Sequence, residues 1–522
     1  MIGKGRQQIF TSEETVTQEN VLSIIQKALK VYQQNARDCQ FLLDFDSGVQ
    51  PLMDRAPKKV MEWIDCQYVD NVAKEANDFW IGFGWGNPIT LVQRGDSVDD
   101  SGNIAKGIAE LNNCYAAAGN VRDLQKMANF IVKCGHCYTL SEINKEWEEG
   151  ESYFTRDVLD PRFAFVVKSS RYPDQRPILG ASLSYDEDKN MYITAYSKDL
   201  RVDISATKKI KGSKKRLNTD DYNWEFAYVE ENPIGKIAIT EWYWTVDRTA
   251  IIESEINALN NINALVSDIG NGVQQNIQAI WWANNVEFPK VEVEDEEGNK
   301  VMVDKKPRNG EWVATKSARD AGQPTIQPLT IDYHLDEMQK TYTEQRSLIL
   351  EKLHVPQRND NSGGSTGVAM DSSTGYADAE SIASAREGIV IGCQNDELKV
   401  VLAVLKASPD IKEDNPMLKL LARDIQPAIR RPKNYDLVSK SNAIATLLSH
   451  GFALEDCVSN IPLFQDATQV ITRSGDGVKK YQDSVFSTDN EAQGGEGEEK
   501  PNSDRLQGDL SDQVGNSPIL NQ

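Results

Sequence analysis

Residues 252–280 read IESEINALNNINALVSDIGNGVQQNIQAI, and this stretch decides the fold. Its apolar residues recur every three or four positions for roughly eight turns, which is the spacing of one face of an α-helix. At a rise of about 1.5 Å per residue such a helix would span on the order of 45 Å, which is more than a compact domain needs. We therefore expect it to pack against a returning helix or against neighbouring chains.

The residues that follow predict a small strand-rich module and then a second helix. A β-hairpin is predicted from valines that alternate on both sides of a polar turn, at Val291, Val293, Val301 and Val303. A helical pattern then resumes from Asp332 to Leu353. The predicted order is helix, β tip and returning helix.

The rest of the chain divides by its residue pattern. Residues 1–247 combine helical and alternating stretches, so we expect a mixed α+β region there whose first ~15 residues are disordered. Residues 356–375 are rich in Gly, Ser, Asn and Thr, which predicts a flexible loop. A third long helix is predicted over 376–408 and further helices with proline breaks over 409–486. The acidic residues 487–522 contain no aromatic side chain and are predicted to be disordered. The fold class is α+β and mainly helical.

Three expectations concern the details of the first region. A helix is predicted over residues 68–79, ending where Gly82 and Gly84 interrupt the pattern. A second is predicted over 107–133, leading directly into a strand. Alternating apolar residues between 163 and 243 predict a run of strands joined by turns.

Charge and cysteine content limit the class of protein. With 57 basic and 79 acidic residues the chain has a formal net charge of −22, which argues against tight wrapping of nucleic acid. The same charge would let DNA slide past without sticking. Seven cysteines in a chain without a secretory signal are expected to be reduced thiols. We expect no membrane span, because no run of about eighteen apolar residues occurs.

The sequence shows no recognisable catalytic, metal or cofactor site. Cys134 and Cys137 form a CxxC without the second ligand pair that zinc needs, so a buried strand is the favoured interpretation. A calcium loop starting at Asp186, Asp188 and Asn190 lacks the required glycine and closing glutamate, which favours a hairpin turn. There is no GxxxxGK[ST] phosphate loop, so any ATP hydrolysis should belong to another protein.

Four short segments resemble portal proteins of tailed phages, most closely those of the siphophages. They occur in the family's order, as FGWGNPIT at 83–90, GHCY at 135–138, NPIGKIAI at 232–239 and STGVAM at 365–370. Ala238 stands where that family usually has proline. The resemblance implies a portal fold, with a wing at 1–247, stem helices at 248–283 and 332–355, a β-rich clip at 284–331, a tunnel loop at 356–375, a long wing helix at 376–408 and a helical crown at 409–486.

The resemblance also implies a function and partners. About twelve copies would form a ring at one capsid vertex, through which double-stranded DNA is packaged and later ejected. The ring would be a platform for head assembly and for attachment of the head–tail connector. The implied partners are the terminase large subunit, the major capsid and scaffolding proteins, and a head-completion or adaptor protein, with no membrane. The protein would be assembled in the host cytoplasm, reside in the virion and have no enzymatic activity.

Three sets of site residues are expected from this resemblance. Packing between stem subunits would use Ile256, Leu259, Ile262, Val266, Ile269, Val273, Ile277 and Trp281. Contacts of the tunnel loop with DNA would use Arg358, Asn359, Asn361, Ser362, Ser365 and Thr366. Contacts of the clip with the terminase or connector would use Lys305, Lys306, Arg308 and Trp312.

Two other classes of protein stay open at this point. A cytosolic coiled-coil scaffold or adaptor would explain the long helices but not the β tip between them. A nuclease or other metal enzyme would use the many carboxylates, although no metal-ligand constellation is recognisable. The basic cluster at 208–216 is either a solvated loop or a contact with nucleic acid, an acidic partner or a neighbouring subunit.

Overall fold

The protein is described by a computed structural model, in which the chain separates into two units, Met1–Asp436 and Leu437–Gln522. The described residues are 3–55, 65–94, 103–209, 222–277, 280–287, 290–294, 300–304, 316–317, 325–329, 334–357, 375–429, 431, 437–452 and 457–458. The predicted tail at 487–522 lies outside them. The described elements confirm the α+β class, with helices and sheets both present in the first unit.

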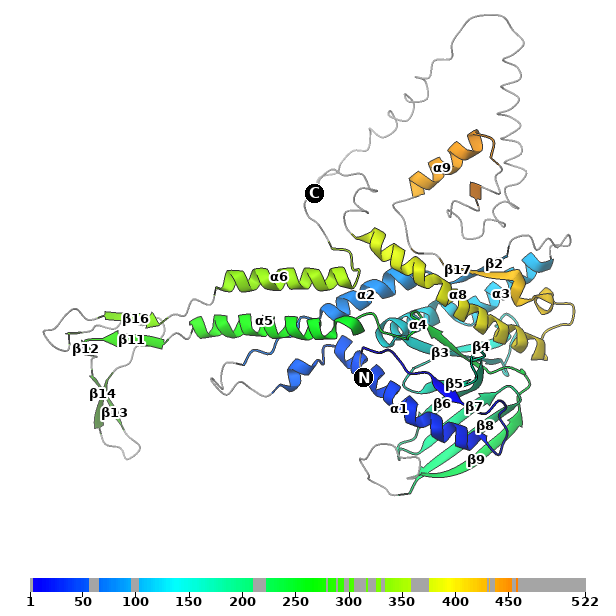
Figure 1. Ribbon diagram of the computed structural model, residues 1–522, viewed down its shortest axis with the longest axis horizontal. Coiled ribbons are helices and arrows are strands. Elements are labelled where there is room, and N and C mark those ends of the chain that lie inside the picture. The colour runs from blue at the N-terminus through cyan, green and yellow to red at the C-terminus, as the bar shows by residue number, and fades with distance from the viewer. Residues whose placement is uncertain are drawn as a thin grey trace, which may run out of the picture. The chain divides into compact units, whose positions relative to one another are not determined.

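The first layer is a six-stranded sheet covered on one face by a long helix (Figure 1). In spatial order the strands are β1 (Ile9–Thr11), β5 (Ala164–Ser169), β6 (Pro177–Tyr185), β7 (Met191–Ser197), β8 (Leu200–Lys208) and β9 (Tyr222–Glu231). Strand β1 pairs in parallel with β5, and the other neighbours are antiparallel. The predicted run of strands between 163 and 243 is therefore confirmed.

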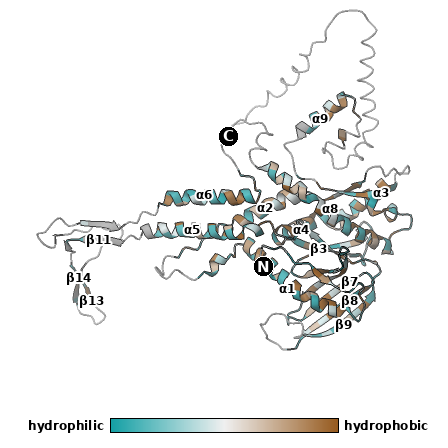
Figure 2. Ribbon diagram, in the orientation of Figure 1, coloured by the Kyte–Doolittle hydropathy of each residue, from teal (hydrophilic) through white to brown (hydrophobic). Residues whose placement is uncertain are grey.

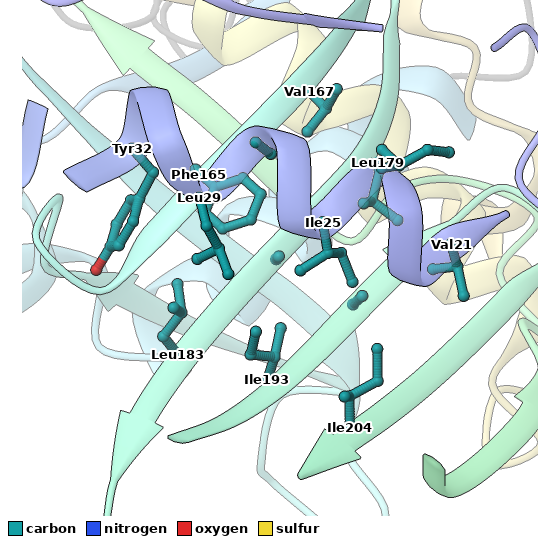
Figure 3. Close-up of a cluster of buried hydrophobic side chains, with 14 of the residues drawn as sticks. Val21, Ile25, Leu29, Tyr32, Phe165, Val167, Leu179, Leu183, Ile193 and Ile204 are labelled. Atoms are coloured by element: carbon teal, nitrogen blue, oxygen red, sulfur yellow. The ribbon is translucent and has the colours of Figure 1, made fainter. Parts of the chain in front are cut away.

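Helix α1 (Val21–Asp46) seals this sheet because its apolar residues lie one turn apart (Figure 3). Val21, Ile25 and Leu29 are all fully buried, as expected for an i, i+4 stripe. They pack on alternate residues of the strands, among them Phe165 and Ile193. The expectation of disorder over the first ~15 residues is wrong, because β1 completes the sheet edge and buries Ile9 in the same core.

A second layer joins a three-stranded sheet to four helices. The sheet has the order β10 (Ile239–Tyr243), β3 (His136–Ile143) and β4 (Phe154–Leu159). The helices are α2 (Val72–Trp85), α3 (Asn103–Ala117), α4 (Asn120–Cys134) and α8 (Tyr376–Ala407). Helices α4 and α8 both pack on β3, and the fully buried Trp242 of β10 lies in the shared core.

Glycine has two different roles in this layer, and both correct an expectation. Helix α2 continues through Gly82 and Gly84 to Trp85, because Gly84 leaves room for the ring of Trp244. A Cβ atom at Gly84 would lie 3.0 Å from that ring. The single helix expected over 107–133 is instead two, since Gly119 adopts a left-handed φ of 86° between α3 and α4.

The long pattern at 252–280 forms a shorter helix than expected. A 3-10 turn, η3 (Glu253–Glu255), leads into α5 (Ile256–Ile277), which lies beside the returning helix α6 (Leu335–Lys352) (Figure 1). The 22 residues of α5 span about 33 Å at the standard rise. Helix α5 does not extend to Trp281, which lies in a strand, and bulky aromatic residues favour strands.

The residues between α5 and α6 form two-stranded antiparallel pairs. These are β11 (Ile280–Asn284) with β16 (Thr325–Leu329), β12 (Val286–Glu287) with β15 (Lys316–Ser317), and β13 (Lys290–Glu294) with β14 (Lys300–Asp304). Val291 pairs with Val303 and Val293 with Val301, which confirms the predicted hairpin.

The C-terminal part is less helical than expected. Helix α8 has the predicted limits, but residues 409–428 form two 3-10 turns, η4 (Pro416–Lys419) and η5 (Ala422–Asp424), and then a strand, β17 (Ile425–Ala428). Strand β17 pairs with β2 (Thr90–Gln93), and Met417, Leu420 and Ile425 are buried in the first unit. The expectation of helices throughout 409–486 is therefore wrong at its start. In the second unit the structure describes helix α9 (Leu437–Ser449).

Candidate functional site

The apolar stripe of α5 divides into two halves that differ in burial. In the half nearer the sheets, Ile256, Leu259 and Ile262 are buried, with Ile262 at 0% exposure. They share a core with Ile349 and Leu350 of α6 and with residues of α1 and α2. This half of the predicted subunit-packing stripe is thus satisfied within one chain.

The other half of the stripe is open. Val266 and Ile269 are only partly buried, and Val273 is 40% exposed. On α6, Leu348 is 51% exposed. Figure 2 shows hydrophilic residues along the first part of α6 and hydrophobic ones near its end. The side chains of the remaining predicted stripe residues, Ile277 and Trp281, lie outside the described part of the structure.

A polar stripe on α5 holds a neighbouring extended segment. Asn263, Ser267 and Asn271 follow one another at four-residue spacing and are all buried. Their side-chain oxygens accept backbone N–H groups of alternate residues, from Asp70 at 3.0 Å, Tyr68 at 3.0 Å and Cys66 at 2.7 Å. Helix α5 therefore offers this segment a row of hydrogen-bond acceptors, as the edge strand of a sheet would.

Close approach of this segment explains a glycine in the middle of α5. A Cβ atom at Gly270 would lie 2.8 Å from Sγ of Cys66, too close for an ordinary contact. The 3-10 turn η1 (Pro51–Asp54) also contacts α5, and the Asn263 amide donates to the side chain of Gln50. Gly270 therefore allows the close packing of this segment on α5.

Helix α6 is fixed to α2 and to the extended segment by polar contacts. Arg346 forms ion pairs with Glu75 of α2 and, at 3.5 Å, with Asp70 of the extended segment. The hydroxyl of Tyr342 donates to Oδ2 of Asp70 at 2.8 Å. Burial and the Asp70 carboxylate raise the pKa of Tyr342 to about 12, so its hydroxyl keeps its proton at neutral pH.

The two ends of the predicted tunnel loop lie side by side. Gly375 adopts a left-handed φ of 86° immediately before α8, and a Cβ atom there would be 3.6 Å from Cα of Pro356. The Gln357 amide donates to the carbonyl of Ser347 at 2.7 Å, which ties the loop's second residue back to α6. The loop residues named above, Arg358, Asn359, Asn361, Ser362, Ser365 and Thr366, lie outside the described residues.

Aromatic side chains of α2 fix both ends of this loop. The Trp80 indole donates to the carbonyl of Leu353 at 2.9 Å, at the end of α6. Phe79 and Phe83 contact the ring of Tyr376, the first residue of α8, with centroid distances of 6.3 Å and 6.2 Å. We call Phe79, Trp80, Phe83 and Tyr376 the aromatic clamp. Sequence reasoning missed it, although closely spaced aromatic residues in one helix were a signal for a packing role.

The predicted clip leaves an apolar surface open. Val291, Val293 and Val303 are 42%, 52% and 47% exposed on the β13–β14 hairpin. An isolated two-stranded hairpin is marginally stable in water, so this surface has reason to be covered. The predicted clip contact residues, Lys305, Lys306, Arg308 and Trp312, lie outside the described residues, as does most of the basic cluster at 208–216.

The residues that were considered for a zinc or calcium site have structural roles instead. Cys134, His136 and Cys137 are buried around the junction of α4 and β3. Asp186 accepts the Asn190 N–H at 2.7 Å in the β6–β7 turn, which confirms the predicted hairpin. Among the described residues, no three His, Cys, Asp or Glu side chains are grouped so that they could hold a metal ion. In the same part of the chain no helix is long and apolar enough to cross a bilayer.

Comparison with known families then decides the relationship. Residues 21–474 match the family model described as "Phage portal protein, SPP1 Gp6-like". The match includes the three-stranded sheet, all strands of the six-stranded sheet except β1, the α5–α6 pair and the residues between α5 and α6. The chain belongs to this portal protein family. It is therefore a structural, non-enzymatic component of a phage particle, of the portal or connector kind, and its siphophage-type resemblance is confirmed.

Two further comparisons concern curated proteins and solved structures. No match was found among curated proteins. A chain of the solved structure described as "Neck of native GTA particle computed with C12 symmetry" matches 75% of this portal-family chain and 90% of its own length, with 11% identity and a TM-score of 0.37.

Proposed function

We propose that this portal-family chain forms a closed ring of about twelve copies at one capsid vertex. Double-stranded DNA is packaged through the ring by a terminase motor and later leaves by the same channel. The ring also supports head assembly and attaches the connector. The observation that carries the proposal is the family match over residues 21–474.

The stem supports a ring through its open half. Val266, Ile269 and Val273 continue the apolar face of α5 beyond the point where α6 and the wing cover it. An exposed apolar strip of this kind is stabilised when a second copy covers it, and a cyclic arrangement covers it on every copy. The polar positions of the stem helices are then left to face a hydrated channel.

The loop and the clip have separate proposed roles. The tunnel loop begins and ends beside the aromatic clamp, so its DNA contacts are carried on a fixed base. Its residues Asn359, Asn361, Ser362, Ser365 and Thr366 are short and polar, with Arg358 as a cation, which suits passing contact with DNA. In the clip, Lys305, Lys306, Arg308 and Trp312 have the composition of a contact with the terminase or connector.

Native mass spectrometry of the purified chain, combined with averaged electron micrographs, tests the ring. We expect a closed assembly of about a dozen subunits with a central channel. A chain that stays monomeric at high concentration would contradict the proposal, and a dimer or trimer would favour the scaffold interpretation. A matched sample at high salt checks that the assembly is held by apolar contact, which salt weakens little.

A further inference from the structure

A small pocket lies where the N-terminal segment, the turn before α5 and helix α8 meet. It has a volume of about 150 Å³ and is lined by Gly3, Thr245, Thr249, Ala250, Ile251, Glu253, Ser254 and Arg386. Its wall contains two charged side chains of opposite sign. The state of these two charges decides what the pocket can bind.

The acidic member is fully compensated within the chain. Glu253 forms a buried ion pair with Arg6. Its carboxylate also accepts three backbone N–H groups, from Gly3 at 2.8 Å, Gly5 at 3.3 Å and Ala250 at 2.9 Å. Glu253 is therefore already paired and does not neutralise the other charge in the pocket.

Among the described residues, the basic member has no acidic partner. Nη1 of Arg386 is buried and has no hydrogen-bond acceptor among the described residues. Its guanidinium lies 5.2 Å from the ring centroid of Trp244, which supports the cation but accepts no hydrogen bond. Burial alone lowers the pKa of Arg386, and no acidic group acts in the other direction. The neighbouring carboxylates of Glu380 and Glu387 bind Arg431 instead.

We propose that the Arg386 pocket receives a carboxylate side chain from a second copy of this chain. The proposal rests on the ring proposed above and names one contact that would hold it together. Arg386 is only partly buried, but its Nη1 atom has lost contact with water without gaining an acceptor among the described residues, which destabilises the isolated subunit. A carboxylate that enters the pocket would pair with the accessible part of the guanidinium through a charge-assisted hydrogen bond and so offset this cost.

The charge balance of the chain favours a carboxylate over a phosphate group. The chain has 79 acidic and 57 basic residues, so neighbouring copies present an excess of carboxylates. Subunits of net charge −22 repel one another, and a local cation at their contact reduces this repulsion.

The first experiment measures the ring after substitution of the arginine. We expect R386Q to raise the subunit concentration at half-dissociation of the ring at least tenfold, measured by native mass spectrometry over a dilution series. The matched control is R171Q, which removes the same charge from an exposed pair, since the side chains of Arg171 and Glu14 are 71% and 57% exposed. A melting curve of each isolated subunit checks that the variants fold.

The second experiment identifies the partner group. In R386K a primary amine replaces the guanidinium, and a carbodiimide links an amine to a touching carboxylate through an amide. Rings are assembled from isotopically heavy and light subunits, and the linked peptides are mapped. We expect mixed heavy–light peptides that join position 386 to an acidic residue of another copy.

The outcomes separate this proposal from the ring itself. If wild-type chains form no ring, the proposed function fails and the pocket proposal fails with it. If all variants form equally stable rings and no mixed peptide appears, the ring stands and the pocket proposal is overturned. If inorganic phosphate stabilises the wild-type subunit but not R386Q, and no mixed peptide forms, the pocket is a phosphate site and the proposal is also overturned.

Discussion

The two halves of α5 have a similar spacing of apolar residues but different surroundings. Ile262, in the half nearer the wing, is completely buried by its own chain, whereas Val273 is 40% exposed. The same three-to-four-residue spacing therefore has two uses along one helix. The first half stabilises the folded subunit, and the second is available for contact between subunits. We make three predictions, ordered from the largest expected effect on unfolding to the smallest. The first and the third test this division, and the second concerns His136 in β3.

The largest effect is expected at Ile262. The substitution I262A removes a fully buried side chain between α5, α6 and the wing, and should lower the free energy of unfolding by about 2–5 kcal/mol. Denaturant unfolding of the isolated subunit measures this change. A loss below about 0.5 kcal/mol would mean that this half is not held by its own chain, and the division between the halves would fail.

A pH effect of intermediate size is expected in the wing. Burial, with smaller contributions from nearby charges, lowers the pKa of His136 to about 4, against about 6.5 for an unfolded chain. Between these values the unfolded chain binds a proton that the folded chain does not. The stability contribution is therefore present above about pH 6.5 and is lost as the pH falls toward 4, by up to about 3 kcal/mol.

Unfolding measured at a series of pH values tests this in wild type and H136N. We expect the variant to lose part of the pH dependence between about 6.5 and 4, and the substitution of the exposed His450 in H450N serves as the control. Identical pH dependence in wild type and H136N would contradict the prediction. His136 lies in the predicted wing, to which α5 is anchored. The result therefore also shows whether low pH destabilises that part of the chain.

The smallest effect on unfolding is expected at Val273. The substitution V273S should change the free energy of unfolding of the isolated subunit by no more than about 0.5 kcal/mol, because the side chain is already exposed. The same variant should weaken the ring, seen as a higher dissociation concentration. Unchanged ring stability together with unchanged unfolding would show that the open half of α5 contacts nothing.

Local patterns predicted an element well where residues next to it in the sequence mark its two ends. Helix α8 begins after Gly375 and ends before Pro409, and both residues are visible as punctuation in the sequence. The β13–β14 hairpin was also predicted from local sequence, and Val291 pairs with Val303 in it. These predictions needed only neighbours in sequence.

The errors arise where distant residues decide the outcome. The pairing of β17 with β2 joins segments more than three hundred residues apart, which no local pattern can reveal. Gly84 remains helical because Trp244, from another element, fills the space beside it. The division of the α5 stripe could not be predicted either, since periodicity identifies an apolar face but not the chain that covers it.

The short distance between the two ends of the predicted tunnel loop affects which insertions and deletions the fold can accept. Since Pro356 and Gly375 meet beside the aromatic clamp, added or deleted residues need not move α6 or α8. The entropy of closing such a loop rises only logarithmically with its length, by about 0.6 kcal/mol for each doubling. Insertions or deletions between these two residues, such as an added reporter peptide, can therefore be accommodated without a shift of α6 or α8.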